Sequence, residues 1–392
     1  MRIRVATLNV WGLPEPFAQD AAARMQAIGG ELASLALDVI AFQEVFTLQA
    51  REQLRAAGAR VGLDQCWHGT EALDGGGLLV LSRLPIEEAR FERYSLRGDV
   101  EQIDTGEYIS GKGFVRLRLA TPDGPLDFIT THLHAGHSSR TRHAYRSHRT
   151  GQIIQLATRA LDRDVPLVAV GDFNLTDEKP EYQVLTGLTG LRDVAAELGR
   201  PFPTAVGSNP YRGGNRNSAK RVDYVFVREG GRSAVEAVSV DRAFGRPIEI
   251  AGRRAAFSNH LGVVAEIDIR PEAGAASPSF NAGAVDLAAR ILAEGRAAAE
   301  QRRMERRLAS GTGMLCAVAA AAVTREGPVS RRRLLRGAFK GASVVALSSS
   351  LGFSALSEHF VPDEIDAFDD AKRRLARLGE SLSRRADNTL ST

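Results

Sequence analysis

Six short apolar runs in the first 270 residues each end, or begin, at a polar side chain suited to acid–base or metal chemistry. The run from Leu167 to Val170 is typical, because it leads directly into Gly-Asp-Phe-Asn, with an acid and an amide two positions apart. Runs of this length, bounded by glycine, proline or polar residues, predict strands. A carboxylate at the end of a buried strand is costly unless a cation or a hydrogen-bond network compensates it. The polar members of the six runs are Asn9, Glu44, His132, Asp172 with Asn174, Asp223, and Asn259 with His260.

Helix-like stretches separate several of these runs, at residues 21–37, 48–57 and 141–161. Interleaved strands and helices favour an α/β sandwich. The chain has 392 residues, more than a single hydrophobic core usually holds, so we expect one large domain with an appendage. We place the main domain at residues 1–270 and a small-residue, proline-containing linker at 271–280.

The polar set offers mainly carboxylate and amide oxygens, which suit a hard divalent cation such as Mg²⁺, with Mn²⁺ as the alternative. The chain has only two cysteines, Cys66 and Cys316, and neither lies near these motifs, so a soft-metal site is disfavoured. His132 and His260 are suited to moving protons or stabilising phosphate charge, and Asp223 could hold His260 in one tautomer. Together these residue types predict metal-assisted attack of water on a phosphate ester.

The first 270 residues are formally neutral. The whole formal charge of +4 lies in residues 271–392, which hold 18 Lys and Arg against 14 Asp and Glu. An enzyme that follows nucleic acid usually presents a basic surface to the phosphates. Nucleic acid is therefore a less favoured partner.

In chain order, the motifs resemble those of the endonuclease/exonuclease/phosphatase superfamily. The resemblance rests on TLNVWG, FQEV, THLH, GDFN, RVDYVFV and SNH, and it covers residues 1 to about 268. It implies a four-layer α/β sandwich, in which two β-sheets are flanked by helices. The C-terminal helical tail falls outside it.

A finer resemblance is to the neutral sphingomyelinases. It rests on Trp11-Gly12-Leu13-Pro14, on Ser110-Gly111-Lys112-Gly113, on the THLH motif and on AYRSHRTGQIIQLA at 144–157. This resemblance implies Mg²⁺ and the cleavage of sphingomyelin, a phospholipid of the sphingolipid class, to ceramide and phosphocholine. A nuclease or another phosphoesterase of the same superfamily is the first alternative, because the chemistry concerns the phosphate and not its substituents.

The resemblance also assigns metal ligands. Glu44 would be the main ligand, with Asn9 in or near the same coordination shell. The position before the final histidine is usually Asp in the superfamily, and here it is Asn259. Asparagine keeps an acceptor oxygen but loses the negative charge, so we expect weaker metal binding or the loss of a second metal position. A catalytically weakened, lipid-binding member is the second alternative.

The remaining roles implied by the resemblance concern the attacking water and the phosphate. Asp172 and Asn174 would hold the water and a phosphate oxygen, and His132 would stabilise the charged phosphorane. His260 would act as the general base, held in place by Asp223. Asp172 is the alternative base, and the sequence leaves the two assignments open.

Two further residues are candidates for contact with substrate. Trp11, with nearby apolar residues, could form a lip against the lipid tails, and Lys112 could meet a lipid headgroup. Residues 106–112 also match G-x-x-x-x-G-K, but Gly113 stands where a nucleotide site needs Ser or Thr, so we interpret the match as coincidental.

The tail, residues 281–392, is rich in Ala and Arg, and we expect helices at 281–308 and 362–385. Its apolar stretches at 314–323 and 341–356 are shorter than the ~20 residues needed to span a bilayer.

A basic segment at 330–340 separates the two apolar stretches and suits anionic lipid heads. The tail is expected either to make peripheral membrane contact through residues 311–357 or to form a helical bundle docked on the main domain or on a second subunit. Met1 leads directly into a strand-like segment without a classical secretion signal, which predicts a cytoplasmic or membrane-associated protein.

Overall fold

The computed structural model describes residues 1–69, 75–98, 110–136, 145–213, 215–230, 233–271, 280–325 and 333–390, and side chains at all of these except 320–325, 333–341, 356, 359 and 385–390. The chain divides into two compact units, one made of Met1–Ala289 with Arg374–Thr392 and the other of Arg290–Arg373. Residues 272–279 of the linker expected at 271–280, and residues 141–144 of the helix expected at 141–161, lie outside the described residues, so the predicted boundary at 270 stays a prediction.

The elements follow one another in the order β1(Arg2–Gly12), α1(Ala21–Leu35), β2(Val39–Val45), α2(Leu48–Ala59), β3(Gln65–His68), β4(Leu79–Ser82), β5(Ile86–Arg93), β6(Gly113–Thr121), β7(Gly124–His132), α3(Arg146–Ala160), β8(Leu167–Asp172), α4(Pro180–Thr189), β9(Arg192–Asp193), α5(Val194–Glu197), β10(Ala205–Val206), β11(Ala219–Lys220), β12(Asp223–Arg228), β13(Ser233–Ala243), β14(Ile248–Ile250), β15(Arg253–Ala255), β16(Gly262–Pro271), α6(Ala282–Arg325), α7(Arg333–Ala355), η2(Leu356–Phe360) and α8(Val361–Leu390).

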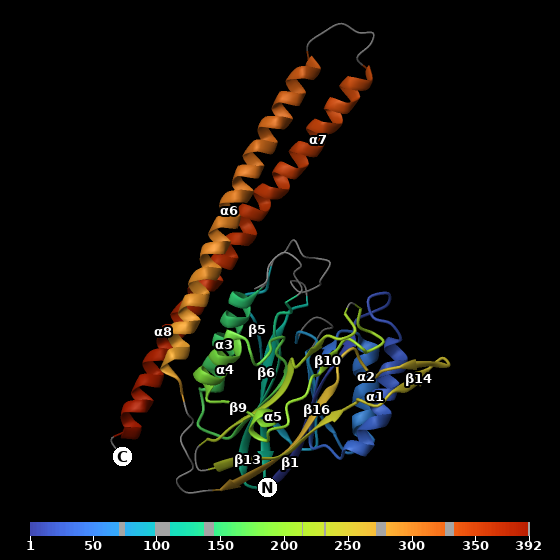
Figure 1. The fold of residues 1–392 in the computed structure, drawn as a ribbon, viewed down its shortest axis with the longest axis vertical. Coiled ribbons are helices and arrows are strands. Elements are labelled where there is room, and N and C mark those ends of the chain that lie inside the picture. Colours follow the sequence, from blue (N-terminus) through green and yellow to red (C-terminus); the bar gives the residue numbers. More distant parts are fainter. Residues whose placement is uncertain are drawn as a thin grey trace. The chain divides into compact units, whose positions relative to one another are not determined.

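Two six-stranded sheets form the centre of the main unit, and the predicted fold class is confirmed. The first sheet has the order β13-β16-β1-β2-β4-β3 and the second has the order β5-β6-β7-β8-β12-β9. Helices α1 and α2 lie beside the first sheet, and α3 and α4 lie beside the second (Figure 1). The sequence produces these layers because strand residues alternate between two faces.

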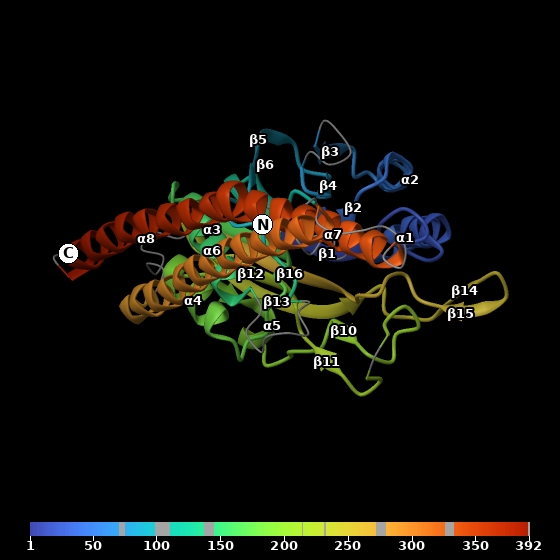
Figure 2. The ribbon, with the colours of Figure 1, turned by 90° about the horizontal axis from the view of Figure 1, so that it is seen from above.

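Two of the layer contacts are formed by separate apolar clusters. Val115, Leu117 and Val170 belong to the cluster between the two sheets. Met25 and Leu32 of α1 belong to the cluster that joins the helices to the first sheet. Figure 2 shows the same arrangement from above, with α1 and α2 on the side away from α3 and α4.

The topology brings the polar strand ends to one edge of the sandwich. Strands β1 and β2 are parallel, as are β7 and β8, so their carboxyl ends point the same way. Strand β12 runs antiparallel to β8, and Asp223 pairs with Asp172 in the register. Strand β16 runs antiparallel to β1, so the segment that enters it, with His260, lies at the same edge.

Two expectations from the sequence are wrong in detail. The run RVDYVFV predicts that Asp223 lies in the middle of a strand, but Asp223 is the first residue of β12, because this antiparallel strand starts where β8 ends. The helix expected at 281–308 continues to Arg325. Gly313 lies inside it, where an added Cβ would be 3.1 Å from the side chain of Ser350, so this glycine permits close packing of α6 on α7.

Candidate active site

The ends of β1 and β2 leave regular strand geometry where the polar residues begin. The register between the two strands shifts between Asn9 and Gly12. Trp11 and Glu44 have positive φ values of 49° and 60°, a region that non-glycine residues seldom occupy. A Cβ on Gly12 would lie 2.5 Å from the carbonyl oxygen of Glu44, so only glycine fits there. Strain of this kind costs roughly 1–3 kcal/mol and is concentrated at functional sites.

Asn9 lies between two carboxylates. Its Nδ2 donates to Oε1 of Glu44 at 2.8 Å and to Oδ2 of Asp172 at 3.0 Å. Its Oδ1 accepts the backbone N–H of Trp11 at 3.0 Å, so the amide nitrogen, not the oxygen, faces the acids. Asn9 and Asp172 are buried, whereas the Glu44 side chain is 19% exposed.

His132 and Asn174 complete the other side of Asp172. Nε2 of His132 is 3.4 Å from Oδ2 of Asp172 and 3.9 Å from Oε1 of Glu44. The backbone N–H of Asn174 donates to Oδ1 of Asp172 at 3.0 Å, and its Nδ2 donates to the carbonyl of Leu133 at the same distance. Asp172 therefore lies at the centre of the site.

A buried acid–imidazole pair faces this group. Nδ1 of His260 is 2.9 Å from Oδ2 of Asp223, which fixes the imidazole orientation and leaves Nε2 as the other ring nitrogen. One ligand atom from each of Asp172, Asp223 and His260 lies within 4.8 Å of the others. The arrangement joins residues that are 88 positions apart in the chain.

Burial and close charges change the proton affinities at the site. Burial, with repulsion from Asp223, raises the pKa of Asp172 to about 7, against smaller opposing effects of His260, Lys112 and Asn9. Burial lowers the pKa of His260, but the Asp223 and Asp172 carboxylates outweigh it and raise this pKa to about 9. His260 is therefore protonated at neutral pH in the metal-free protein.

Three further predicted residues, Lys112, Trp11 and Asn259, lie outside the group around Asp172. Lys112 is buried, and its Nζ donates to the carbonyl of Leu133 at 3.0 Å, so it belongs to the interior of the site. The ring of Trp11 lies 5.6 Å from that of Tyr211. Asn259 is half-buried, and its Oδ1 lies 3.3 Å from the Ser258 hydroxyl oxygen. Among the described contacts, none joins its side chain to Glu44 or Asp172.

Sequence reasoning missed the residues that support the site from behind. Gln43 donates from Nε2 to the hydroxyls of Thr7 at 3.0 Å and Thr130 at 3.2 Å, and so joins the two sheets directly below Glu44. The hydroxyl of Thr204 accepts the backbone N–H of Asp223 at 3.2 Å. A buried amide inside the apolar run of β2 was the available signal for Gln43, whereas Thr204 had none.

The residues present fit a divalent cation. Asp172 and Asp223 are buried carboxylates close enough to repel one another, and Oδ1 of Asp223 has no hydrogen-bond partner within the described part of the chain. Mg²⁺ prefers oxygen ligands and keeps several waters, which favours the partly exposed Glu44 together with Asp172. A softer ion such as Zn²⁺ would favour the side that contains the His260 imidazole.

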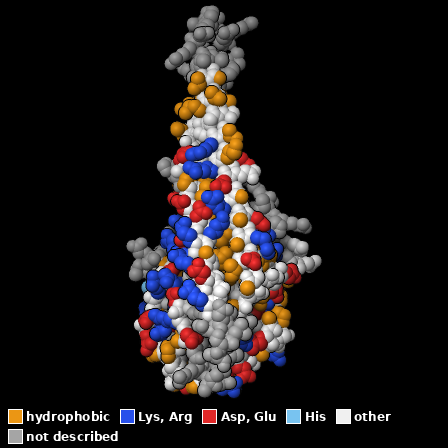
Figure 3. Space-filling view, turned by 90° about the vertical axis from the view of Figure 1, so that its left-hand side faces the viewer, with side chains coloured by type: hydrophobic (Ala, Val, Ile, Leu, Met, Phe, Trp, Pro, Cys, Tyr) orange, Lys and Arg blue, Asp and Glu red, His pale blue; other side chains and the backbone are white. Residues whose placement is uncertain are grey.

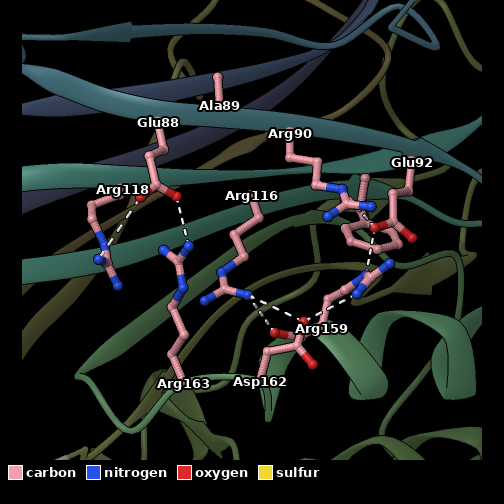
Figure 4. A pocket seen from close by; sticks show the side chains of 10 residues that line it. Glu88, Ala89, Arg90, Glu92, Arg116, Arg118, Arg159, Asp162 and Arg163 are labelled. Carbon is pink, nitrogen blue, oxygen red and sulfur yellow. Dashed lines mark hydrogen bonds and ion pairs between the residues drawn. The ribbon is translucent and has the colours of Figure 1, made fainter.

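A hollow of about 440 Å³ lies elsewhere, on the outer face of the second sheet, and none of the predicted site residues lines it. Arginines and acids line it in pairs, such as Arg163 with Glu88 at 2.6 Å (Figure 4). It lies over β5, an edge strand, and a charged edge discourages pairing with other chains. We interpret it as a solvated surface and not as the active site.

Solved structures support the fold. A Danio rerio TDP2 complexed with single-strand DNA product has a TM-score of 0.54 and 19% identity, covering 68% of this chain and 99% of that one. Beta toxin from Staphylococcus aureus has a TM-score of 0.53 and 18% identity, covering 67% and 99%. At these identities the likeness shows the fold alone.

Sequence relatives are more informative. Human sphingomyelin phosphodiesterase 2 is 28% identical over 299 residues, 72% of this chain and 68% of the relative. An inositol phosphosphingolipids phospholipase C of Schizosaccharomyces pombe is 29% identical over 215 residues, 54% of this chain and 49% of the relative. The chain thus spans about half to two thirds of these relatives.

The Endonuclease/Exonuclease/phosphatase family itself matches residues 6–260, which include every strand end described above. On that match, and on the two-sheet fold that presents these strand ends, the chain belongs to the endonuclease/exonuclease/phosphatase family.

Proposed function

We propose that the chain is a divalent-metal-dependent phosphodiesterase that cleaves the headgroup bond of a sphingolipid. Sphingomyelin, cleaved to ceramide and phosphocholine, is the first candidate substrate. The observation that carries the proposal is the Asn9 amide, which holds Glu44 and Asp172 together opposite the Asp223–His260 pair. The names of the relatives support the substrate class, since both act on sphingolipid phosphodiesters.

Glu44 and Asp172 would hold the cation, which we take to be Mg²⁺, with Mn²⁺ as the alternative. When bound, such an ion withdraws charge from phosphate oxygens. Asn9 bridges the two carboxylates by donating to one oxygen of each, which leaves the other oxygen of each carboxylate for the ion. Asn259 offers an uncharged oxygen, which contacts the Ser258 hydroxyl and neither of the two proposed ligands, and this disfavours a second metal position.

Asp172 is better suited than His260 to accept the proton of the attacking water. A general base works best when its pKa is near the operating pH, and burial with repulsion from Asp223 raises the pKa of Asp172 to about 7 in the metal-free protein, which offsets the lowering that a bound cation brings. His260 is protonated under the same conditions, so its Nε2–H can donate to the phosphate or to the leaving oxygen. By accepting a hydrogen bond from Nδ1, Asp223 stabilises the doubly protonated ring and so the presence of the Nε2 proton.

His132, Asn174 and Lys112 would stabilise the charge that develops on phosphorus. His132 Nε2 lies beside both carboxylates, and Asn174 and Lys112 both donate to the carbonyl of Leu133. These donors are already in place before substrate binds, which is the condition under which such groups accelerate reactions most.

The test is a lipid panel assayed with Mg²⁺, with Mn²⁺ and with EDTA. Sphingomyelin, an inositol phosphosphingolipid and phosphatidylcholine would be compared by release of the phosphorylated headgroup, with supercoiled plasmid as the nuclease arm. We expect turnover of a sphingolipid that EDTA removes and Mg²⁺ or Mn²⁺ restores. Plasmid nicking without lipid turnover would instead assign a nuclease.

One variant tests whether the chain is an active enzyme or a catalytically weakened, lipid-binding member of the family. If Asn259 has only weakened metal binding, Asn259→Asp should restore turnover at lower Mg²⁺ concentrations. Lipid binding without turnover in both the wild type and this variant would contradict the proposed function.

The second unit supports a role for the tail at the lipid surface. None of the helices in the described part of the chain combines the length and the apolar character needed to cross a membrane. Near its base the unit is held by ion pairs, for example Arg296 with Asp369 at 2.7 Å and Arg302 with Glu364 at 2.6 Å. These pairs are typical of a helix contact that is surrounded by water.

Towards the tip of the unit, where α6 packs against α7 and not α8, small residues lie in the helix contact and apolar side chains lie on the surface. Small residues form the contact between α6 and α7. The hydroxyl of Ser310 donates to the carbonyl of Ser350 at 2.9 Å, and the hydroxyl of Ser350 donates to the carbonyl of Ser310 at 2.7 Å. Large apolar side chains point outward, with Leu315 72%, Val318 61% and Val345 66% exposed. Figure 3 shows apolar side chains gathered near the described tip, above a section rich in charged ones. Small residues inside and apolar residues outside are typical of helices in lipid. We therefore propose peripheral membrane contact through this tip.

The double variant Leu315→Glu/Val345→Glu is expected to lower co-sedimentation of the full chain with sphingomyelin vesicles at least tenfold. Burying each apolar side chain in lipid contributes roughly 1.5–3 kcal/mol, and each charge opposes insertion. Val238→Glu, at a 36% exposed position on β13, is the matched control and should leave sedimentation unchanged. Equal sedimentation of all three proteins would exclude the tip as the contact.

A further inference from the structure

Arg24, on the first turn of α1, is completely buried yet donates only to backbone carbonyls. Its acceptors are Val10 at 2.6 Å, Trp11 at 2.8 Å, Gln19 at 2.9 Å and Phe257 at 3.4 Å. One guanidinium therefore joins the end of β1, the loop before α1 and the segment before His260. Its five fixed N–H donors make this possible, and a lysine ammonium could not reproduce the geometry.

Two aromatic rings cover the same guanidinium. Its central carbon lies 5.0 Å from the ring centre of Trp11 and 5.3 Å from that of Tyr211. No carboxylate of the described residues forms an ion pair with it. Burial lowers the pKa of Arg24 to about 10, so the side chain is still charged at neutral pH. The Asp20 and Glu44 carboxylates offset only part of the cost of burying this charge, because neither pairs with it directly, and such a cost is tolerated where the group has a particular task.

The carbonyls that Arg24 holds belong to the residues that orient the site. Trp11, whose carbonyl it binds, donates its own N–H to Oδ1 of Asn9 and thereby turns the Asn9 amide toward Glu44 and Asp172. This contact requires the strained backbone of Trp11, which the guanidinium stabilises from both the carbonyl and the ring.

The second segment held by Arg24 leads to the other half of the site. Phe257 precedes Ser258, whose hydroxyl donates to the Asn9 carbonyl at 2.6 Å and accepts the backbone N–H of His260 at 3.3 Å. Arg24 thus contacts the backbone beside both Asn9 and His260, the residues that bring the carboxylates and the imidazole together.

We propose that Arg24 is a positioning residue that sets the spacing of the Glu44–Asp172 pair through Trp11 and Asn9, and so sets the affinity of the site for a divalent cation. The proposal rests on the proposed function, because it requires that Glu44 and Asp172 bind the ion. It assigns to Arg24 a task beyond holding α1 against the sheet.

The experiment compares Arg24→Lys with Arg228→Lys in the full chain. Arg228 is the matched control, because it is also buried and donates to carbonyls, those of Ala160 at 2.6 Å and Thr189 at 3.2 Å, at the opposite end of β12 from Asp223.

Mn²⁺ affinity is measured by electron paramagnetic resonance, and Tm is measured in EDTA. We expect Arg24→Lys to weaken Mn²⁺ binding about 10–100-fold, as loss of a group that orients metal ligands typically does. Arg228→Lys should lower Tm but change Mn²⁺ affinity less than about twofold, well below that range.

Equal losses of Mn²⁺ affinity in the two variants, or no loss in Arg24→Lys, would overturn the proposal. A wild type that binds no Mn²⁺ would overturn the proposed function instead, so the two failures are distinguishable. If Arg24→Lys does not fold, Asn9→Ala tests the same route, because it removes the amide through which Arg24 and Trp11 act on the Glu44–Asp172 pair. Unchanged Mn²⁺ affinity in this variant would also overturn the proposal.

Discussion

The His260→Ala substitution is expected to lower kcat for sphingolipid hydrolysis by about 10²–10³, with little change in KM. Removing one preorganised donor to a developing negative charge typically has this effect. His260 is such a donor, because Asp223 raises its pKa to about 9 and fixes its orientation at 2.9 Å. Initial rates at saturating lipid and Mg²⁺ measure the effect. His68→Ala, on β3 and outside the predicted site, is the control and should retain full activity.

The same substitution has a consequence for stability. The pKa of His260 is raised in the folded protein, so its protonation stabilises the fold below pH 6.5 and this contribution is lost as pH rises through 9. In EDTA, the Tm of the wild type should therefore fall more steeply between pH 7 and about 9.5 than that of His260→Ala. Parallel pH profiles of the two proteins would contradict the assigned ion pair.

The sequence predicted the fold and most of the site because both depend on local patterns. The run before Asp172 forms the strand β8, Leu167–Asp172, which ends inside Gly-Asp-Phe-Asn. Parallel pairing places the carboxyl ends of β1 and β2 at one edge of the first sheet and those of β7 and β8 at one edge of the second. The polar residues at these strand ends lie close together because the two sheets pack face to face.

What the sequence could not predict depends on contacts between distant segments. The helix expected at 281–308 continues as α6 to Arg325, because small residues such as Gly313 let it pack against Ser350 of α7. The direction of the Asn9 amide depends on the backbone of Trp11, and that backbone depends on Arg24. An arginine in a helix is usually a surface residue, so nothing in the sequence identified this one as buried.

The Asp172→Asn variant is expected to lose activity by about 10²–10⁴ while it gains stability in EDTA. The loss follows because an amide cannot accept the proton of the attacking water. The gain follows because the pKa of Asp172 is raised to about 7 in the folded protein by burial and by Asp223, so ionisation at this position opposes folding. The unfolded chain releases this proton near pH 4, and the folded chain holds it up to about pH 7. The wild type therefore loses stability across that window, and the variant does not.

The Tm difference between Asp172→Asn and the wild type in EDTA should grow from pH 4 to about pH 7 and remain constant above it. Asp64→Asn, at an exposed position, is the control and should show no such trend. Excess Mg²⁺ should reverse the order, because an ion that binds only the folded wild type raises its Tm by mass action. If Mg²⁺ stabilises the wild type and the variant equally, Asp172 is not a ligand. If the Tm difference in EDTA does not depend on pH, the pKa of Asp172 is not raised by burial and by Asp223. The electrostatic reason for a cation at this edge of the sandwich would then be wrong.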